Sequence, residues 1–196
     1  MKNITVGITG PSGFLAGHTA RLLASNEHIE VVLCPREYFG DATRLQAFVE
    51  RCDSIIHLAG MNRGSNDDIY AINTQLVDQL LGATEGKNAA TQIIFSSSTQ
   101  RDSVYGKSKQ YCERRLAEWA EAKPDRSATT FVIPNIFGPG CRPHYNSVVA
   151  TFCHMLAGGK TPEVLQDNAI EFIWVTDVAQ AIAKELNEPV YGHRQR

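Results

Sequence analysis

Hydrophobic residues alternate along the chain between short β-branched runs and longer stretches in which apolar residues recur every three or four positions. The short runs indicate buried strands, and the longer spacing indicates helices with one face in the core. Residues 3–10 (NITVGITG) fit a strand, residues 13–26 an amphipathic helix, and residues 29–34 (IEVVLC) a second strand. The chain therefore begins as strand, helix, strand.

The same alternation continues through most of the chain. Further strands are expected over 54–60, 91–98, 128–138 with a break at Pro134, and 169–175. Helices are expected over 42–52 after an Asp41 cap, 67–84, 105–122, 145–158, and 176–186 with Thr176 as cap. Residues 187–196 are expected to be a polar tail. Strands that are apolar on both faces and alternate with helices predict an α/β fold, a mostly parallel sheet covered by helices on both sides.

Composition narrows the function. With 196 residues, 43% hydrophobic and 20% charged, the chain fits one soluble domain spanning 1–196. A net charge of -2 without a basic run or basic amphipathic helix argues against nucleic acid and membrane partners. The first residues resemble no signal peptide, so a cytoplasmic location is expected. The five cysteines lack paired spacing, which predicts mostly buried thiols and no metal site.

The first expected strand ends in a glycine turn, TGPSGFLAG, with Gly10, Gly13 and Ala16 three residues apart. Such a turn between a strand and a helix lets backbone N–H groups approach a pyrophosphate, which favours dinucleotide binding over a plain connecting turn. After the second strand comes Arg36, followed by Glu37. An arginine at this point favours NADP(H) over NAD(H), and the alternative is a solvated surface pair.

The segment SSSTQRDSVYGKSK places a strand-end serine cluster just before a helix that carries Tyr105 and Lys109. Residues four apart lie on one helix face, so both side chains can reach one site. A nearby ammonium stabilises a phenolate and makes a tyrosine a usable proton shuttle. Ser98, by position, could hydrogen-bond a reacting oxygen. The alternative is a serine cluster that caps backbone groups beside a chance YxxxK.

Taken in order, these segments resemble the extended short-chain dehydrogenase/reductase family, the NAD-dependent epimerases and dehydratases. The matching pieces are TGPSGFLA, DSIIHLAG, Asn73 in AINTQLVDQLL, FSSS, YGKSK, PNIFGPG and FIWVTDVAQAI. Within that family, HLAGMNR and PNIFGPGCRPHYNSVVATFC are most similar to the reductase domain of capsular polysaccharide enzymes that reduce a UDP-linked 4-keto sugar.

The resemblance implies a Rossmann-like doubly wound sheet, with a cofactor-binding core over 1–134 and a short, truncated substrate-binding portion over 135–196. It implies that Ser98, Tyr105 and Lys109 are catalytic, with Tyr105 as general acid/base and Lys109 on the nicotinamide ribose. Tyr105 and Lys109 are also implied to contact the cofactor. The other implied cofactor contacts are Gly10, Gly13, Phe14, Leu15, Arg36, Leu58, Ala59 and Gly60. The implied nucleotide-sugar contacts are Asn135, Arg142, His144 and Asn146.

Four other features have competing interpretations. His57 is expected to be a satisfied core histidine or a histidine next to the cofactor, rather than a metal ligand. Cys141 is expected to be a passive loop thiol, and Asp177 a residue that favours a helix dipole. The helix over 67–84 has a wide apolar stripe. That stripe is explained either by deep burial in its own domain or by a homodimer contact.

Two functions follow. The first is an NADP(H)-preferring oxidoreductase that reduces or epimerises a nucleotide-linked sugar in polysaccharide biosynthesis. The second is a catalytically weak NADP(H)-binding module that serves as a redox sensor or as a subunit of an assembly. The Ser98, Tyr105 and Lys109 set favours the enzyme, because a sensor needs no proton shuttle.

Overall fold

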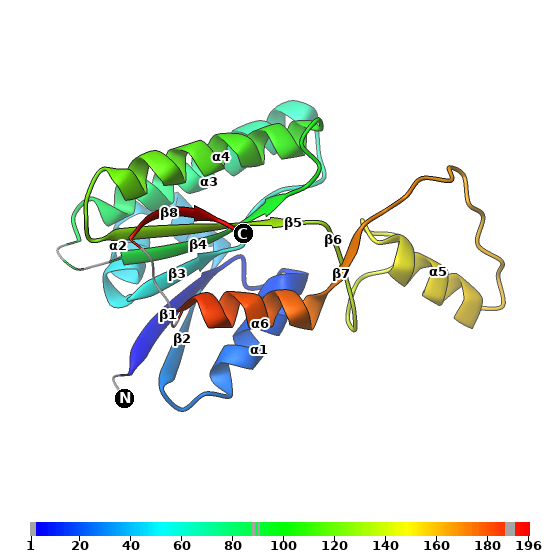
Figure 1. Ribbon diagram of the computed structural model, residues 1–196, viewed down its shortest axis with the longest axis horizontal. Coiled ribbons are helices and arrows are strands. Elements are labelled where there is room, and N and C mark those ends of the chain that lie inside the picture. Colours follow the sequence, from blue (N-terminus) through cyan, green and yellow to red (C-terminus); the bar gives the residue numbers. More distant parts are fainter. Residues whose placement is uncertain (1–2, 88, 90, 187–190) are drawn as a thin grey trace.

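The alternation of strands and helices is confirmed by a computed structural model, which describes residues 3–87, 89, 91–186 and 191–196 (Figure 1). The strands are β1 (Ile4–Thr9), β2 (Ile29–Cys34), β3 (Ser54–His57), β4 (Thr91–Ser98), β5 (Arg126–Ile133), β6 (Asn135–Phe137), β7 (Phe172–Trp174) and β8 (Gly192–Gln195). The helices are α1 (Phe14–Ala24), α2 (Ala42–Arg51), α3 (Asn66–Thr84), α4 (Val104–Glu121), α5 (Val148–Ala157) and α6 (Val175–Leu186), with a short 3-10 helix, η1 (Arg36–Gly40).

The main sheet has six parallel strands in the order β2-β1-β3-β4-β5-β8. Helices α2, α3 and α4 cover one face, and α1 and α6 cover the other (Figure 1). The strand order reverses between β1 and β3, which puts the carboxyl ends of these strands at the crevice where such sheets bind ligands. The Rossmann-like architecture expected from the sequence is therefore present.

The sheet separates two hydrophobic cores. Neighbouring residues on the central strands point to opposite faces, so Ile55 and Ile93 lie in the core under α2, α3 and α4, while Ile56 and Ile94 lie in the core under α1 and α6. All four side chains are fully buried. This two-sided burial explains why these strands have continuous apolar runs rather than alternating ones.

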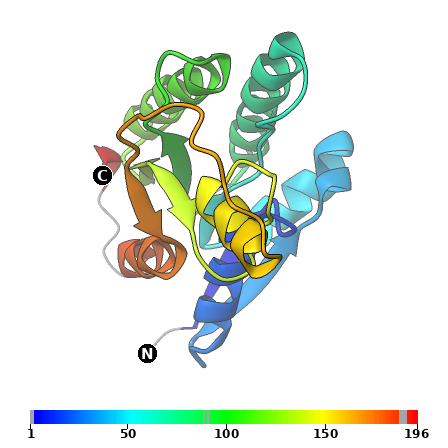
Figure 2. The ribbon, with the colours of Figure 1, turned by 90° about the vertical axis from the view of Figure 1, so that its right-hand side faces the viewer.

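A small lobe extends from the carboxyl edge of the main sheet. Pro134 ends β5, and the chain then forms β6, α5 and β7, of which β6 and β7 pair as a separate parallel two-stranded sheet. Figure 2, viewed from this end, shows α5 in front of the carboxyl edge. No residue of α5 is buried, although the helix is rich in apolar side chains. The lobe comprises residues 135–174, and α6 and β8 return to the main sheet.

Two sequence-based expectations near the C-terminus were wrong. Residues 192–195, expected in a polar tail, form β8 and pair with β5, while 187–190 lie outside the described residues. The polar side chains of β8 are tolerated because this is an edge strand. Helix α6 begins at Val175, so Thr176 lies inside its first turn rather than at the cap. Within the described ranges, no helix is long and apolar enough to span a bilayer.

Candidate cofactor and catalytic site

The glycine turn after β1 forms a close-packed cradle at the carboxyl edge. Gly10 has φ +66°, and a β-carbon there would lie 2.8 Å from the Ala59 backbone in the loop after β3. The Gly13 N–H donates to the Gly10 carbonyl at 2.9 Å, and Gly13 is the residue before α1. Phe14 and Leu15 form the first turn of α1. The N–H groups of this helix end therefore face the crevice, as a pyrophosphate site requires.

Thr9, at the end of β1, ties this cradle to the loop after β3. Its hydroxyl oxygen accepts the N–H groups of Leu58 and Ala59, each at 3.1 Å. The same hydroxyl lies 2.9 Å from Nδ1 of His57. Since two N–H groups already point at the oxygen, the hydroxyl proton is donated to His57. The Thr9 side chain thus connects the glycine turn after β1 with the loop after β3, the two segments predicted to contact the cofactor.

His57 is a buried core histidine, but it is not fully satisfied as expected, because its Nε2 has no hydrogen-bond partner among the described residues. It is fully buried, and its ring stacks on Phe95 with a centroid distance of 5.9 Å. Burial, together with the positive charge of Lys109, lowers the pKa of His57 to about 3, so the ring is neutral at physiological pH. A neutral, stacked imidazole in this position supports the strand ends rather than taking up protons.

Helix α4 carries the tyrosine and lysine to the same edge. Ser103 caps the helix, with its hydroxyl accepting the Gly106 N–H at 2.9 Å. Tyr105 lies in the first turn and is half-buried, and Lys109 follows one turn later with 3% exposure. The Lys109 Nζ lies 5.5 Å from the centre of the Tyr105 ring. The two side chains therefore face one site, as the i, i+4 spacing predicted.

The buried ammonium of Lys109 is held by neutral groups. It donates to the Ser96 carbonyl at 2.9 Å and lies 4.5 Å from the centre of the Phe95 ring. A β-carbon at Gly60 would lie 3.6 Å from this ammonium and 3.1 Å from Oδ1 of Asn73. Because Gly60 has no side chain, the space between the loop after β3 and the Lys109 ammonium stays open. A buried cation beside such a space fits the hydroxyl groups of a nicotinamide ribose.

The serine cluster ends β4 as predicted, and each serine has a different environment. Ser98 is buried, and its hydroxyl accepts the Gln100 N–H at 3.1 Å, which leaves the hydroxyl proton for a second partner. The Ser97 hydroxyl donates to Glu113 of α4, a carboxylate that also binds Arg101. Ser97 is therefore committed to the structure, whereas Ser98 keeps a hydroxyl proton for a further partner, and its catalytic role stays a prediction.

Arg36 begins η1, directly after β2, and its side chain is exposed. This position lies at the same edge as the glycine turn, because β2 and β1 are adjacent parallel strands. Three of the five cysteines, Cys34, Cys52 and Cys112, are buried thiols, as expected. Burial raises the pKa of Cys34 and Cys112 to about 12 and that of Cys52 to about 11.

The candidate substrate residues lie in the lobe and its connecting loop. Asn135 begins β6, and Arg142, His144 and Asn146 lie in the exposed loop before α5. The Arg142 guanidinium carbon is 5.4 Å from the centre of the Tyr145 ring. Asn135 and Asn146 both line a pocket of about 220 Å³ between β6 and the start of α5. Whether these residues face a sugar nucleotide stays a prediction.

Arg63 contacts this loop and was missed by sequence reasoning. It is the last residue of the segment HLAGMNR, but nothing in the local pattern predicts which residues this arginine contacts. In the structure its guanidinium donates to the side chain of Asn146 and the carbonyl of His144, at 3.1 and 3.2 Å. The loop after β3 is therefore connected both to the glycine cradle and to the lobe.

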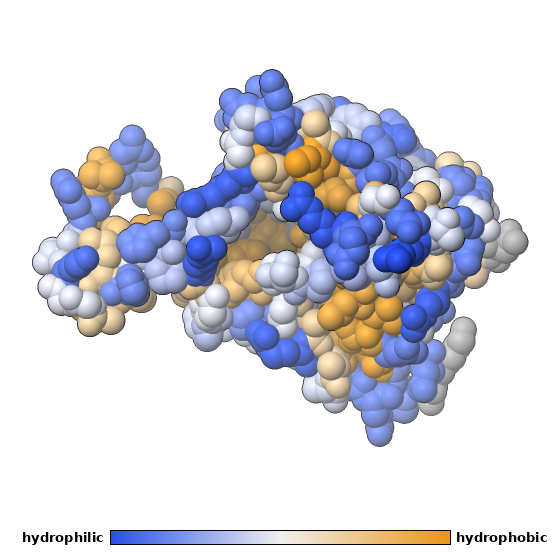
Figure 3. Space-filling model, turned by 180° about the vertical axis from the view of Figure 1, so that it is seen from behind, coloured by the Kyte–Doolittle hydropathy of each residue, from blue (hydrophilic) through white to orange (hydrophobic). Residues whose placement is uncertain are grey.

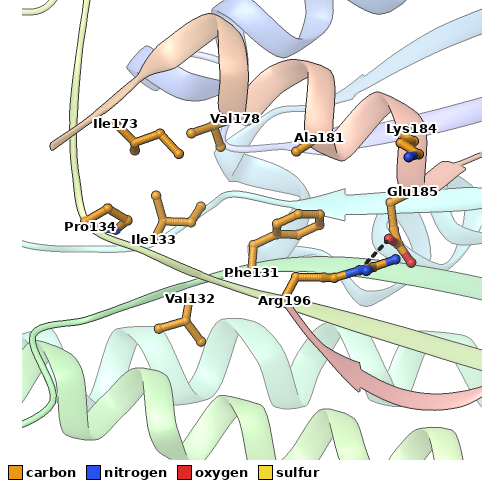
Figure 4. A pocket seen from close by; sticks show the side chains of 10 residues that line it. All are labelled: Phe131, Val132, Ile133, Pro134, Ile173, Val178, Ala181, Lys184, Glu185 and Arg196. Atoms are coloured by element: carbon orange, nitrogen blue, oxygen red, sulfur yellow. Dashed lines mark ion pairs between the residues drawn. The ribbon is translucent and has the colours of Figure 1, made fainter. Parts of the chain in front are cut away.

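A larger pocket, about 390 Å³, lies elsewhere. Figure 4 shows Phe131, Ile133 and Val178 pointing into it between β5 and α6, with the Glu185–Arg196 ion pair at one end. This pocket lies on the α6 side of β5, whereas Lys109 lies on the α4 side. Figure 3 shows a hollow with apolar surface where the lobe joins the body.

The wide apolar stripe of α3 is largely used within the fold. Ile69, Val77, Leu80 and Leu81 are buried, and α3 packs against both α2 and α4. Tyr70 remains 40% exposed and meets the Tyr111 ring of α4 at a centroid distance of 6.3 Å. Two helix neighbours account for most of the stripe, and the homodimer contact stays a prediction.

Comparison with known proteins supports this description. The sequence matches the model of the NAD dependent epimerase/dehydratase family over residues 6–195. A UDP-2-acetamido-2,6-beta-L-arabino-hexul-4-ose reductase from Pseudomonas aeruginosa is 32% identical over 186 residues, which is 92% of this chain and 49% of that protein. The chain thus spans about half the length of this relative.

Solved structures show the same fold. The capsular polysaccharide assembling protein CapF from Staphylococcus aureus superimposes with a TM-score of 0.80 and 27% identity, covering 98% of this chain and 52% of that one. A UDP-N-acetylglucosamine 4-epimerase from Bacillus cereus has a TM-score of 0.79 with 18% identity, covering 99% of this chain and 75% of that one. The second likeness is evidence for the fold alone.

Proposed function

Because the chain belongs to the NAD dependent epimerase/dehydratase family, we propose that it takes part in a nicotinamide-dependent oxidation or reduction of a nucleotide-linked sugar in polysaccharide biosynthesis. The observation that carries this proposal is the buried Lys109 ammonium, which lies one turn after Tyr105 and borders the open space at Gly60. A dinucleotide-binding module without chemistry would not need the tyrosine and lysine on one helix face at this edge.

The cofactor would lie across the crevice. The N–H groups of the first turn of α1, at Phe14 and Leu15, would hold the pyrophosphate next to Gly13, and Leu58, Ala59 and Gly60 would border the middle of the cofactor. We propose that Arg36 pairs with a 2′-phosphate, which favours NADP(H) over NAD(H). When bound, the nicotinamide would supply or accept the hydride.

The proton chemistry belongs to the chain. In the reducing direction, the Tyr105 hydroxyl gives its proton to the oxygen of a sugar ketone, while Ser98 donates a hydrogen bond to the same oxygen. The Lys109 ammonium, 5.5 Å from the Tyr105 ring centre, offsets the negative charge left on the phenolate. An epimerase would use the same three groups and return the hydride to the sugar.

The substrate would enter from the lobe side. Arg142 would pair with a phosphate group, and Asn135, His144 and Asn146 would offer polar contacts for the sugar nucleotide. The relative from Pseudomonas aeruginosa is named as a UDP-sugar reductase, which supports a UDP-linked 4-keto sugar as the substrate class. The three buried thiols are consistent with action in the cytoplasm.

The test is a fluorescence titration of the purified chain with NADPH and with NADH, repeated in the presence of UDP-N-acetylglucosamine as a substrate stand-in. Tyr105→Phe is the matched variant, since it removes only the hydroxyl. We expect NADPH to bind more tightly than NADH, the sugar nucleotide to change the signal, and Tyr105→Phe to abolish turnover of a keto sugar while keeping NADPH affinity. Cofactor binding with no response to the sugar nucleotide would favour a redox-sensing or assembly module instead.

A further inference from the structure

Two residues of the loop after β3, Asn62 and Arg63, contact three consecutive residues of the lobe, 144–146. The Arg63 Nε–H donates to Oδ1 of Asn146 at 3.1 Å, and its Nη2–H donates to the His144 carbonyl at 3.2 Å. The guanidinium carbon also lies 4.4 Å from the centre of the Tyr145 ring, within cation–π range. Next to it, Oδ1 of Asn62 accepts the Tyr145 hydroxyl at 3.3 Å.

The contacted residues have an unusual backbone. His144 has φ +56° and Asn146 has φ +54°, the left-handed region that residues with a β-carbon adopt only at a cost in free energy. Both receive a hydrogen bond from Arg63. From the lobe side, the His144 N–H donates to the Thr151 hydroxyl of α5 at 2.9 Å. The turn at 144–146 is therefore held by α5 on one side and by the main body on the other. On the main-body side, Arg63 hydrogen-bonds to both residues that have a positive φ angle.

The loop that carries Arg63 is itself fixed to the helices of the site. Asn73 of α3 accepts the Met61 N–H at 2.7 Å and donates to the Met61 carbonyl at 2.9 Å. The same side chain donates to the Ser108 hydroxyl at 2.9 Å, next to Lys109 on α4. A continuous set of contacts thus runs from the catalytic helix through Met61 and Arg63 to the lobe.

We propose that Arg63 is a positioning residue that holds the 142–146 loop, with its candidate substrate groups, in register with the cofactor edge. The substrate named in this proposal rests on the proposed function, whereas the contacts of Arg63 are observed independently of that function. Within the described ranges no carboxylate pairs with Arg63, so its hydrogen bonds go to neutral groups and depend on the planar, forked guanidinium. Lysine would keep the charge and lose this geometry.

The experiment compares the full chain with Arg63→Gln, Arg63→Lys and a control, Arg44→Gln, which changes an exposed arginine on α2. Two quantities are measured. The first is amide hydrogen exchange at 144–146 in the free protein, and the second is the Kd for UDP-N-acetylglucosamine in the presence of NADPH.

We expect both Arg63 variants to exchange faster at 144–146 and to bind the sugar nucleotide about tenfold more weakly. Their NADPH affinity should stay within about twofold of wild type, and the control should match wild type in both measurements. Coupling is checked with Asn146→Ala, whose effect on the sugar nucleotide should largely disappear in the Arg63→Gln background.

Unchanged exchange at 144–146 in Arg63→Gln would overturn the positioning role. So would an equal loss of NADPH and sugar-nucleotide affinity, because that result indicates a general disturbance of the fold. If wild type binds NADPH but not UDP-N-acetylglucosamine, the proposed substrate class fails, and the exchange measurement alone then supports or overturns the role of Arg63. Arg63→Lys keeps the test decisive if Arg63→Gln does not fold.

Discussion

The carbonyl oxygen of Gln100 lies against Gly106, in the space that a β-carbon on that glycine would fill. The Ser103 hydroxyl closes the same turn, since it donates to the Gln100 carbonyl at 2.9 Å and accepts the Gly106 N–H at 2.9 Å. This close approach lets the loop between Ser98 and Tyr105 pack against the first turn of α4. The glycine inside the YGKSK segment is therefore needed by the loop that crosses it.

Gly106→Ala should displace this loop and misplace the serine relative to the tyrosine. Overpacking of this kind typically costs about 1–3 kcal/mol of the free energy of unfolding, measured by urea denaturation. The control is Gly82→Ala on α3, where nothing lies within 4 Å of the added carbon. That change should leave stability equal or raise it by about 0.5–1 kcal/mol. If the two variants have the same free energy of unfolding, the loop at Gln100 can move to make room for the added carbon without loss of stability.

Lys109→Met tests the buried ammonium. Methionine fills much of the same volume, and removing a buried cation without a carboxylate partner should change the free energy of unfolding by less than about 1 kcal/mol. The stabilisation that NADPH gives, about 2.7 kcal/mol at a concentration of 100 times its Kd, should be largely lost. Thermal denaturation with and without NADPH measures both. Full retention of the NADPH effect would remove Lys109 from the cofactor site.

The low pKa of His57 should make stability depend on pH. The pKa is about 3 in the folded chain, against an ordinary value of 6.5, because of burial and the Lys109 charge. Between these values the unfolded chain binds a proton that the folded chain does not. The contribution of His57 to the free energy of unfolding therefore falls as pH falls below 6.5, by about 1.4 kcal/mol per pH unit.

His57→Asn isolates this effect, because asparagine offers the Thr9 hydroxyl an acceptor but does not titrate. Urea denaturation at pH 7.5 and pH 5.0 should show the advantage of wild type over the variant shrinking by roughly 2 kcal/mol at the lower pH. A difference between the two proteins that does not change with pH would mean that the folded chain can protonate His57.

Much of the fold could be predicted because it depends on local patterns. The apolar runs that contain Ile55 and Ile93 predict central strands, and the spacing of Tyr105 and Lys109 predicts that both lie on one helix face, as the structure confirms. The Asp41 cap was also correct, with its side chain accepting the Arg44 N–H at 3.1 Å. Each of these features follows from a few neighbouring residues and the hydrophobic effect.

The features that sequence reasoning missed depend on partners far away in the chain. The polar segment that forms β8 becomes a strand because β5 and Glu185 are there to pair with it. Arg63 looks like a solvated arginine until the chain returns, 81 to 83 residues later, with His144 and Asn146. Edge strands and contacts between loops have weak local signals, so only the assembled fold identifies them.

Arg36 gives a prediction about cofactor choice. If it pairs with the 2′-phosphate, Arg36→Met should weaken NADPH binding about tenfold and leave NADH binding unchanged. Titration of both cofactors by fluorescence measures the ratio. Glu37→Gln is the matched control at the next position and should not weaken NADPH. If Arg36 and Glu37 are only a solvated surface pair, neither variant will change the preference.

Glu185 anchors the last strand of the sheet. Its side chain on α6 is 4% exposed, accepts the Thr129 hydroxyl at 2.9 Å, and pairs with Arg194 and Arg196 around β8. Glu185→Gln removes the charge while keeping the shape. Because hydrogen bonds to a charged group contribute about 1.5–3 kcal/mol, the free energy of unfolding should fall by about 2 kcal/mol.

The loss should be concentrated at the edge of the sheet. We expect faster amide exchange at 192–195 in Glu185→Gln, because β8 is held by β5 on one side only. The control is Glu118→Gln, which changes an exposed carboxylate that pairs with Arg115 at 2.8 Å and should cost less than about 0.5 kcal/mol. If both variants lose the same small amount and 192–195 stay protected, the strand pairing itself holds β8, and the buried carboxylate is not its anchor.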